Sequence, residues 1–172
     1  MNAATNGDRP RVVVTGMGAM SPLGESVAEF WQGLVTGRSG IDHMKITDPT
    51  QFPCKFSGEV LGFEPTEYMD RKEARRMARF SQFAVAAAGQ AIEDAALDLE
   101  SEDRERVGVV LGNGAGGYPE TENAVRTLVA IGGMKISPFY MPSMLCNMAT
   151  ANVSRLNGIY GYTNTVVTAC AA

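Results

Sequence analysis

Three runs of β-forming residues, two of them closed by glycine-rich stretches, constrain the fold of this chain more than any other feature. The runs are residues 11–15, 107–111 and 163–168. Helical stretches follow the first two runs, at about residues 26–35 and 119–130. Strands that alternate with helices predict an α/β domain whose sheet is covered by helices on both faces.

A long helix is predicted over residues 65–97, because small apolar residues recur there at every third or fourth position. Four cations near its start are spaced i, i+3, i+4 and i+7: Lys72, Arg75, Arg76 and Arg79. In a continuous helix these side chains would share one face. A chain of formal net charge −4 is therefore expected to carry a local basic stripe.

Charge almost disappears from the last 50 residues, 123–172. This stretch contains no Asp or Glu, and its only cations are Arg126, Lys135 and Arg155. The whole chain is 45% hydrophobic and 20% charged, which is typical of a globular protein. A stretch with so little charge is expected to form the core of a larger domain or an oligomer interface. We therefore expect surface outside these 172 residues to cover it.

Residues 1–10 are predicted to form a flexible polar arm, and residues 11–172 the domain that follows it. The arm lacks the apolar core of a secretion signal, and no run of about 18 apolar residues suggests a membrane span. We expect a cytoplasmic protein.

The three cysteines are odd in number and widely spaced, which argues against a disulfide framework or a zinc site. The lone histidine, His43, is expected to be structural, and neither a metal nor a cofactor is expected.

The glycine loop, residues 112–117, matches the pattern G-x-G-x-x-G between a predicted strand and a predicted helix. A dinucleotide site would also need an acidic residue about 20 positions further on. Residues 131–135 contain none. A tight turn, or close approach of the backbone to another chain, is the favoured interpretation. A nucleotide-binding oxidoreductase is the alternative, which NADH binding would reveal.

Cys170 ends the third β-forming run and has small neighbours on both sides. A strand that delivers a cysteine to the start of a helix is a common way to build a nucleophile, because the helix N-terminus lowers the pKa of the thiol. Only two residues follow, so we expect that helix to lie outside this chain. The alternative is a buried cysteine that acts as an inert small hydrophobic residue.

Four motifs, in order from about residue 11 to the last residue, resemble the β-ketoacyl-acyl carrier protein synthases, most closely the synthase II type and the polyketide ketosynthases. The motifs are residues 12–18 with 21–24, residues 37–41, residues 136–140 with 142–143, and residues 168–170. The resemblance implies a thiolase-like layered αβαβα fold, usually a homodimer, built from two similar halves. This chain resembles the N-terminal half.

The resemblance implies a decarboxylative Claisen condensation in fatty-acid or polyketide chain elongation. Acyl carrier protein would deliver an acyl group to Cys170, and malonyl-acyl carrier protein would then lose CO₂ and attack the resulting thioester. Two histidines and a lysine of the family's second half would activate the malonyl group. His43 matches neither histidine, so the 172 residues alone are expected to be inactive.

The same resemblance assigns Ala115 and Tyr140 to the acyl pocket, Tyr140 reaching it from the partner subunit. Ala115 is smaller than the aliphatic residue common in synthase II enzymes, which implies a deeper pocket.

Lys72, Arg75 and Arg76 match the docking surface for the acidic acyl carrier protein. A solvated helix face is the alternative for these cations. A non-catalytic, chain-length-determining subunit of a polyketide synthase is the alternative for the chain, although such subunits typically lack the cysteine.

Overall fold

The core of this computed structural model, which describes residues 11–172, is a parallel two-stranded sheet. The arm predicted over residues 1–10 lies outside the described residues. Strand β3 (Val109–Gly112) pairs with β4 (Thr163–Val166) from the Val109–Thr163 pair to the Gly112–Val166 pair. Both strands, and the helix α4 (Tyr118–Ile131) between them, confirm sequence predictions.

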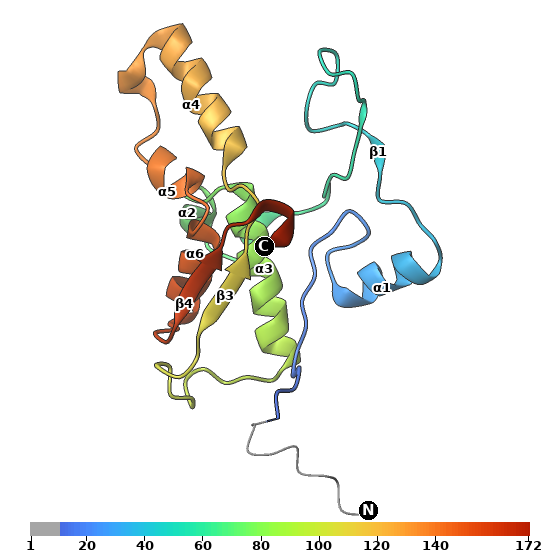
Figure 1. The fold of residues 1–172 in the computed structure, drawn as a ribbon, viewed down its shortest axis with the longest axis vertical. Coiled ribbons are helices and arrows are strands. Elements are labelled where there is room, and N and C mark those ends of the chain that lie inside the picture. Colours follow the sequence, from blue (N-terminus) through green and yellow to red (C-terminus); the bar gives the residue numbers. More distant parts are fainter. Residues whose placement is uncertain (1–10) are drawn as a thin grey trace, which may run out of the picture.

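Two helices, α3 (Arg79–Asp94) and α6 (Met148–Asn157), pack together and line one face of this sheet (Figure 1). Five apolar residues form the buried cluster where these elements meet: Met77, Val85, Val109, Val153 and Ile159. Val110, next along β3, points the other way and is exposed. Within residues 11–172 the sheet is therefore covered on one face, where the sequence predicted two.

The predicted first strand does not form. Residues 11–20 carry no strand, and the side chains of Val12 and Val14 are 93% and 81% exposed. A β-branched run becomes a strand only beside a neighbour that satisfies its backbone, and the described part of the chain provides none here. The segment lies instead along α3, where the backbone N–H of Met17 donates to Asp94 (2.9 Å) and that of Ala19 to Gln90 (3.0 Å).

The helix predicted over residues 65–97 is broken into three pieces: the 3₁₀ turn η1 (Pro65–Glu67), the short helix α2 (Arg71–Ala74), and α3. The break occurs because Ala78, at the N-terminus of α3, has an extended backbone with ψ near 155°, and both Met77 and Ala78 are buried. Burial of this turn prevails over the helical propensity of the surrounding residues.

Helix α1 (Val27–Val35) confirms the prediction for residues 26–35, and it begins where the Ser26 hydroxyl accepts a hydrogen bond from the Glu29 N–H. After α1 the chain forms a small antiparallel hairpin of β1 (Asp42–His43) and β2 (Phe56–Ser57), which the sequence did not predict. In Figure 1 these elements stand beside the α3–α6 core.

The remaining elements lie between α4 and the end of the chain. They are the 3₁₀ turn η2 (Gly133–Lys135), the short helix α5 (Tyr140–Met144) and the 3₁₀ turn η3 (Ala169–Ala171). Across the described residues, no helix combines the length and apolar character needed to cross a bilayer.

Candidate active site

Cys170 lies in η3, immediately after β4, and it is exposed. The turn is closed by two backbone hydrogen bonds, from Ala171 to Thr168 (3.1 Å) and from Ala172 to Ala169 (3.2 Å). Ala169 has a φ of +52°, a left-handed conformation that costs a non-glycine residue about 1–2 kcal/mol. This sharp turn after the strand presents the thiol at the surface of the described residues, which does not fit the alternative of a buried cysteine.

The glycine loop packs directly against the turn that carries Cys170. A Cβ atom added at Gly112 would lie 2.5 Å from the carbonyl carbon of Ala172, so only glycine allows this approach. At Gly114 the nearest atom would be the Ala169 carbonyl oxygen, 3.9 Å away. The favoured interpretation of the loop as a tight turn therefore fits the structure, and the close approach is to residues of the same chain.

The other end of the glycine loop packs against the segment between α5 and α6. Gly116 has a φ of +81°, and a Cβ atom there would lie 3.0 Å from the Cα atom of Cys146. The backbone N–H of Gly117 donates to the Met144 carbonyl (3.0 Å). The loop thus joins the Cys170 turn on one side to the start of α6 on the other.

Sequence reasoning missed Asn113, which lies between the first two glycines of the loop. Its side chain hydrogen-bonds to Cys146, Ala115 and Gly116. Asparagine beside glycine is a common turn signal, so the position was open to prediction.

Ala115 and Tyr140, the two predicted pocket residues, lie in different places. Ala115 is exposed on the glycine loop, whereas Tyr140 is half-buried at the start of α5. Tyr140 lines a hollow of about 270 Å³ together with Phe139 and Arg76, and neither Ala115 nor Cys170 borders it. A larger hollow of about 1240 Å³, between α1 and residues 59–62, contains none of the predicted site residues.

The predicted basic stripe is not one helix face, because the helix breaks within it. Lys72 lies on α2, and Arg75 and Arg76 follow directly. Arg79 begins α3, donates a hydrogen bond to the Val60 carbonyl, and lies over two aromatic rings, so it serves the packing of the fold. The three cations predicted to dock a partner thus remain together on one exposed turn, without Arg79.

These three cations are not equivalent. The guanidinium of Arg76 lies over the ring of Phe139, 4.9 Å from its centroid. Within residues 11–172, Lys72 and Arg75 form no ion pair. Glu73, between them, is paired with Arg155 of α6, and this hydrogen-bonded cation lowers the pKa of the Glu73 carboxyl. The negative charge of Glu73 is therefore partly offset, which leaves the turn basic.

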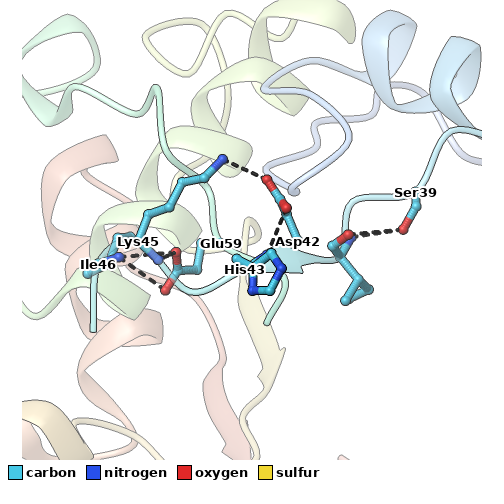
Figure 2. A network of polar contacts seen from close by, with 7 residues as sticks. Ser39, Asp42, His43, Lys45, Ile46 and Glu59 are labelled. Atoms are coloured by element: carbon cyan, nitrogen blue, oxygen red, sulfur yellow. Dashed lines mark hydrogen bonds and ion pairs between the residues drawn. The ribbon is translucent and has the colours of Figure 1, made fainter. Parts of the chain in front are cut away.

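His43 belongs to a polar network on the β1–β2 hairpin (Figure 2). Its ring lies 4.4 Å from that of Phe56. The neighbouring Asp42 accepts a hydrogen bond from Lys45 (2.6 Å), and the Glu59 carboxylate accepts from the backbone N–H groups of Lys45 and Ile46. These contacts lower the pKa of both carboxyls, and the bonds to Glu59 join the two arms of the hairpin. The network fits the structural role predicted for His43.

Comparison with known proteins gives a consistent family match. The family model described as "Beta-ketoacyl synthase, N-terminal domain" matches residues 9–172. The chain is 43% identical, over 97% of its length, to the 3-oxoacyl-(acyl-carrier-protein) synthase 2 of Synechocystis. It is 42% identical, over 93% of its length, to the protein of that name from Vibrio cholerae. It covers 40% and 39% of these two relatives.

Two solved structures show the same relation. One, described as "The ishigamide ketosynthase/chain length factor", superposes with a TM-score of 0.85 at 29% identity, over 94% of this chain and 40% of that one. The other is a β-ketoacyl synthase from Burkholderia phymatum, with a TM-score of 0.72 at 26% identity, over 91% and 38%. The chain thus spans about 40% of the length of the proteins it resembles.

Proposed function

This chain belongs to the β-ketoacyl synthase family, and we propose that it supplies the nucleophile half of a 3-oxoacyl-(acyl carrier protein) synthase, with Cys170 as the acyl acceptor. Its fold is that of the N-terminal half of a thiolase-like enzyme. The observation that carries the proposal is the position of Cys170, exposed on a sharp turn at the end of β4. A noncatalytic chain-length subunit has no need of such a thiol.

The proposed reaction has two steps. In the first, the Sγ atom of Cys170 attacks the carbonyl carbon of an acyl thioester, and the thiol of the acyl carrier protein leaves. In the second, malonyl-acyl carrier protein loses CO₂, and its carbanion attacks the Cys170 thioester, so that a C–C bond forms and Sγ is released. Two histidines and a lysine, from the part that relatives have beyond the matched length, would stabilise the developing enolate.

The proposed partner at Lys72, Arg75 and Arg76 is the acyl carrier protein, which is named in the description of the curated relatives. Exposed cations on one turn accelerate the encounter with an acidic protein. Replacing Lys72 and Arg75 with Glu should raise the KM for carrier-linked substrate and weaken its dependence on salt. The Arg126→Glu variant, with its change on α4, serves as the control. An unchanged KM in the double variant would contradict docking.

We further propose that residues 11–172 act as one half-domain after an arm of residues 1–10, in a cytoplasmic homodimer. Ala115 would line the acyl pocket of its own subunit, and Tyr140 that of the partner. This division is consistent with their separation in the structure, since the hollow beside Tyr140 is bordered by neither Ala115 nor Cys170. Ala115→Phe should shift the full-length enzyme toward shorter acyl chains, and continued extension of long chains would argue against a pocket at this position.

The decisive experiment is transfer of an acyl group from acyl carrier protein to the full-length enzyme, followed by intact mass. We expect one acyl adduct on the wild type. Cys170→Ala should remove it and lower condensation on the order of 10⁴-fold. Cys54→Ala is the matched control, because Cys54 is also an exposed free cysteine. An adduct that survives in the Cys170→Ala variant would refute the proposed role.

A further inference from the structure

Asn113 connects three segments of the candidate site. Its Nδ2 group donates to the carbonyl of Cys146 at 2.6 Å, and its Oδ1 atom accepts from the backbone N–H groups of Ala115 (3.2 Å) and Gly116 (3.1 Å). Its own backbone N–H donates to the Val166 carbonyl at 2.9 Å. One residue therefore joins the end of β4, the glycine loop and the segment before α6.

The chemistry of these contacts calls for an amide. The carbonyl of Cys146 needs a donor, and the two loop N–H groups need an acceptor. An asparagine side chain provides both, whereas an ionised aspartate provides acceptors alone and alanine provides neither. The side chain is partly buried, so a missing partner would leave polar backbone groups poorly satisfied. The surrounding glycines add conformational freedom that such a tether must restrict.

The two backbone N–H groups that donate to Oδ1 precede and follow the Cα atom of Ala115 along the chain. These hydrogen bonds fix the backbone N–H of Ala115 itself and that of Gly116, the next residue. The neighbouring Gly112 is packed against Ala172, two residues after Cys170. The placement of Ala115 relative to the Cys170 turn therefore depends on the conformation that Asn113 holds.

We infer that Asn113 is a positioning residue that determines acyl-chain selectivity by fixing Ala115 relative to Cys170. This inference rests on the proposed function, because it assumes that Ala115 lines an acyl pocket. Loss of the tether lets the loop move, which alters the depth of the pocket more than the reactivity of the thiol. The expected effect is therefore a change in the ratio of the kcat/KM values for acyl substrates of different length.

The test compares Asn113→Ala and Asn113→Asp in the full-length enzyme, with hexanoyl and hexadecanoyl carrier thioesters as substrates. Asn113→Ala should change the ratio of the two kcat/KM values by about two- to ten-fold, the range expected for one or two lost hydrogen bonds. Asn113→Asp keeps the acceptor and should change the ratio less. Asn157→Ala is the control, because Asn157 also donates a side-chain hydrogen bond to a backbone carbonyl, that of Val153, within α6.

A parallel fall for both substrates would indicate a merely structural role and would overturn the inference, as would an unchanged ratio. If Asn113→Ala does not fold, the comparison between Asn113→Asp and the wild type decides. A wild type that takes up no acyl group on Cys170 would refute the proposed function instead.

Hydrogen exchange of the backbone amides of residues 113–117 then tests the tether without any substrate. Exchange should be faster in Asn113→Ala than in the wild type and in Asn157→Ala, and Asn113→Asp, which keeps the acceptor, should be affected less. Equal exchange in all four proteins would overturn the inference.

Discussion

The α3–α6 core and residues 11–62 differ in how much of their apolar surface is buried. The core buries a continuous apolar cluster between two helices and a sheet. Over residues 11–62, Gly33 is the only buried residue, and large apolar side chains such as Trp31 and Ile41 are exposed. The contacts of this region with α3 include the hydrogen bonds from Met17 and Ala19 and the close backbone approach of Gly16 and Gly18.

The difference shows that local sequence signals can specify a helix such as α1 but do not specify what it packs against. Helix α1 forms because Ser26 caps it. Residues 12–14, although strongly β-forming, do not become a strand, because strand formation depends on a neighbour. The apolar surface of residues 11–62 is what would be expected of a region whose packing partner lies elsewhere.

The largest effect that would test this comparison is truncation of a core valine. Val153 is 3% exposed and Val12 is 93% exposed. Val153→Ala should lower the free energy of unfolding of the 172-residue chain by about 2 kcal/mol, from lost burial and a residual cavity. Val12→Ala should change it by less than about 0.5 kcal/mol. Urea denaturation measures both values, and equal losses would mean that Val12 is buried after all.

A smaller effect is expected at the contact between the two regions. A Cβ atom at Gly18 would lie 2.0 Å from the carbonyl oxygen of Ala87 on α3, so Gly18→Ala must displace residues 11–20. We expect a cost of about 1–2 kcal/mol. Gly89→Ala is the matched control on α3: nothing lies within 4 Å of its added Cβ atom, and it should stabilise by about 0.5–1 kcal/mol.

Thermal unfolding gives these two stabilities, and limited proteolysis reports on residues 11–24. Faster cleavage is expected in Gly18→Ala alone. Cleavage at the wild-type rate in that variant would show that the contact with α3 does not hold this segment.

The smallest expected effect concerns two ion pairs: a long-range pair between Arg155 of α6 and Glu73 of α2, and a local pair between Lys45 and Asp42 in the hairpin. Arg155 holds the pKa of Glu73 below its ordinary value of 4.5, so the pair stabilises the fold above that pH, and the contribution is lost as pH falls through the lowered pKa. Glu73→Gln should cost at most about 1 kcal/mol at pH 7. The difference from wild type should shrink on acidification.

Asp42→Asn removes the local pair with Lys45 and serves as the control for Glu73→Gln. It should leave the global transition unchanged, because both partners lie on the hairpin. Thermal unfolding from pH 7 to pH 3 follows both variants. A Glu73→Gln difference that stays constant with pH would contradict a role for the charge.

The sequence predicted best where local signals agreed. Strands β3 and β4 contain mostly β-forming residues, and α4 ends at Gly132, whose φ of +89° suits glycine. The break between α2 and α3 was not predictable in this way, because residues 72–78 contain no glycine or proline to mark it. Burial of Met77 and Ala78 causes the break, and burial is a property of the whole fold.

In the candidate site too, local sequence predicts some features, whereas others depend on tertiary packing. The position of Cys170 after a strand followed from the run of β-formers before it. The contact of the glycine loop with Ala172 and with Cys146 joins residues far apart in sequence, and no local pattern specifies it. The regrouping of the basic stripe, with Arg79 turned toward Phe63 and Phe83, depends equally on tertiary packing.

The close packing of the glycine loop has a consequence for evolution and for engineering. Gly112, Gly116 and Gly117 each have a backbone atom within 3.0 Å of an added Cβ atom, so substitution there would displace the Cys170 turn, or the end of α5 and the segment that follows it. A Cβ atom at Gly114 would meet only the Ala169 carbonyl oxygen, 3.9 Å away, and Ala115 is exposed. The loop therefore offers a position where side-chain size can vary while the Cys170 turn stays in place. Under the proposed role of Ala115 in the acyl pocket, selection for a new acyl length should accumulate substitutions at residue 115 and spare Gly112, Gly116 and Gly117.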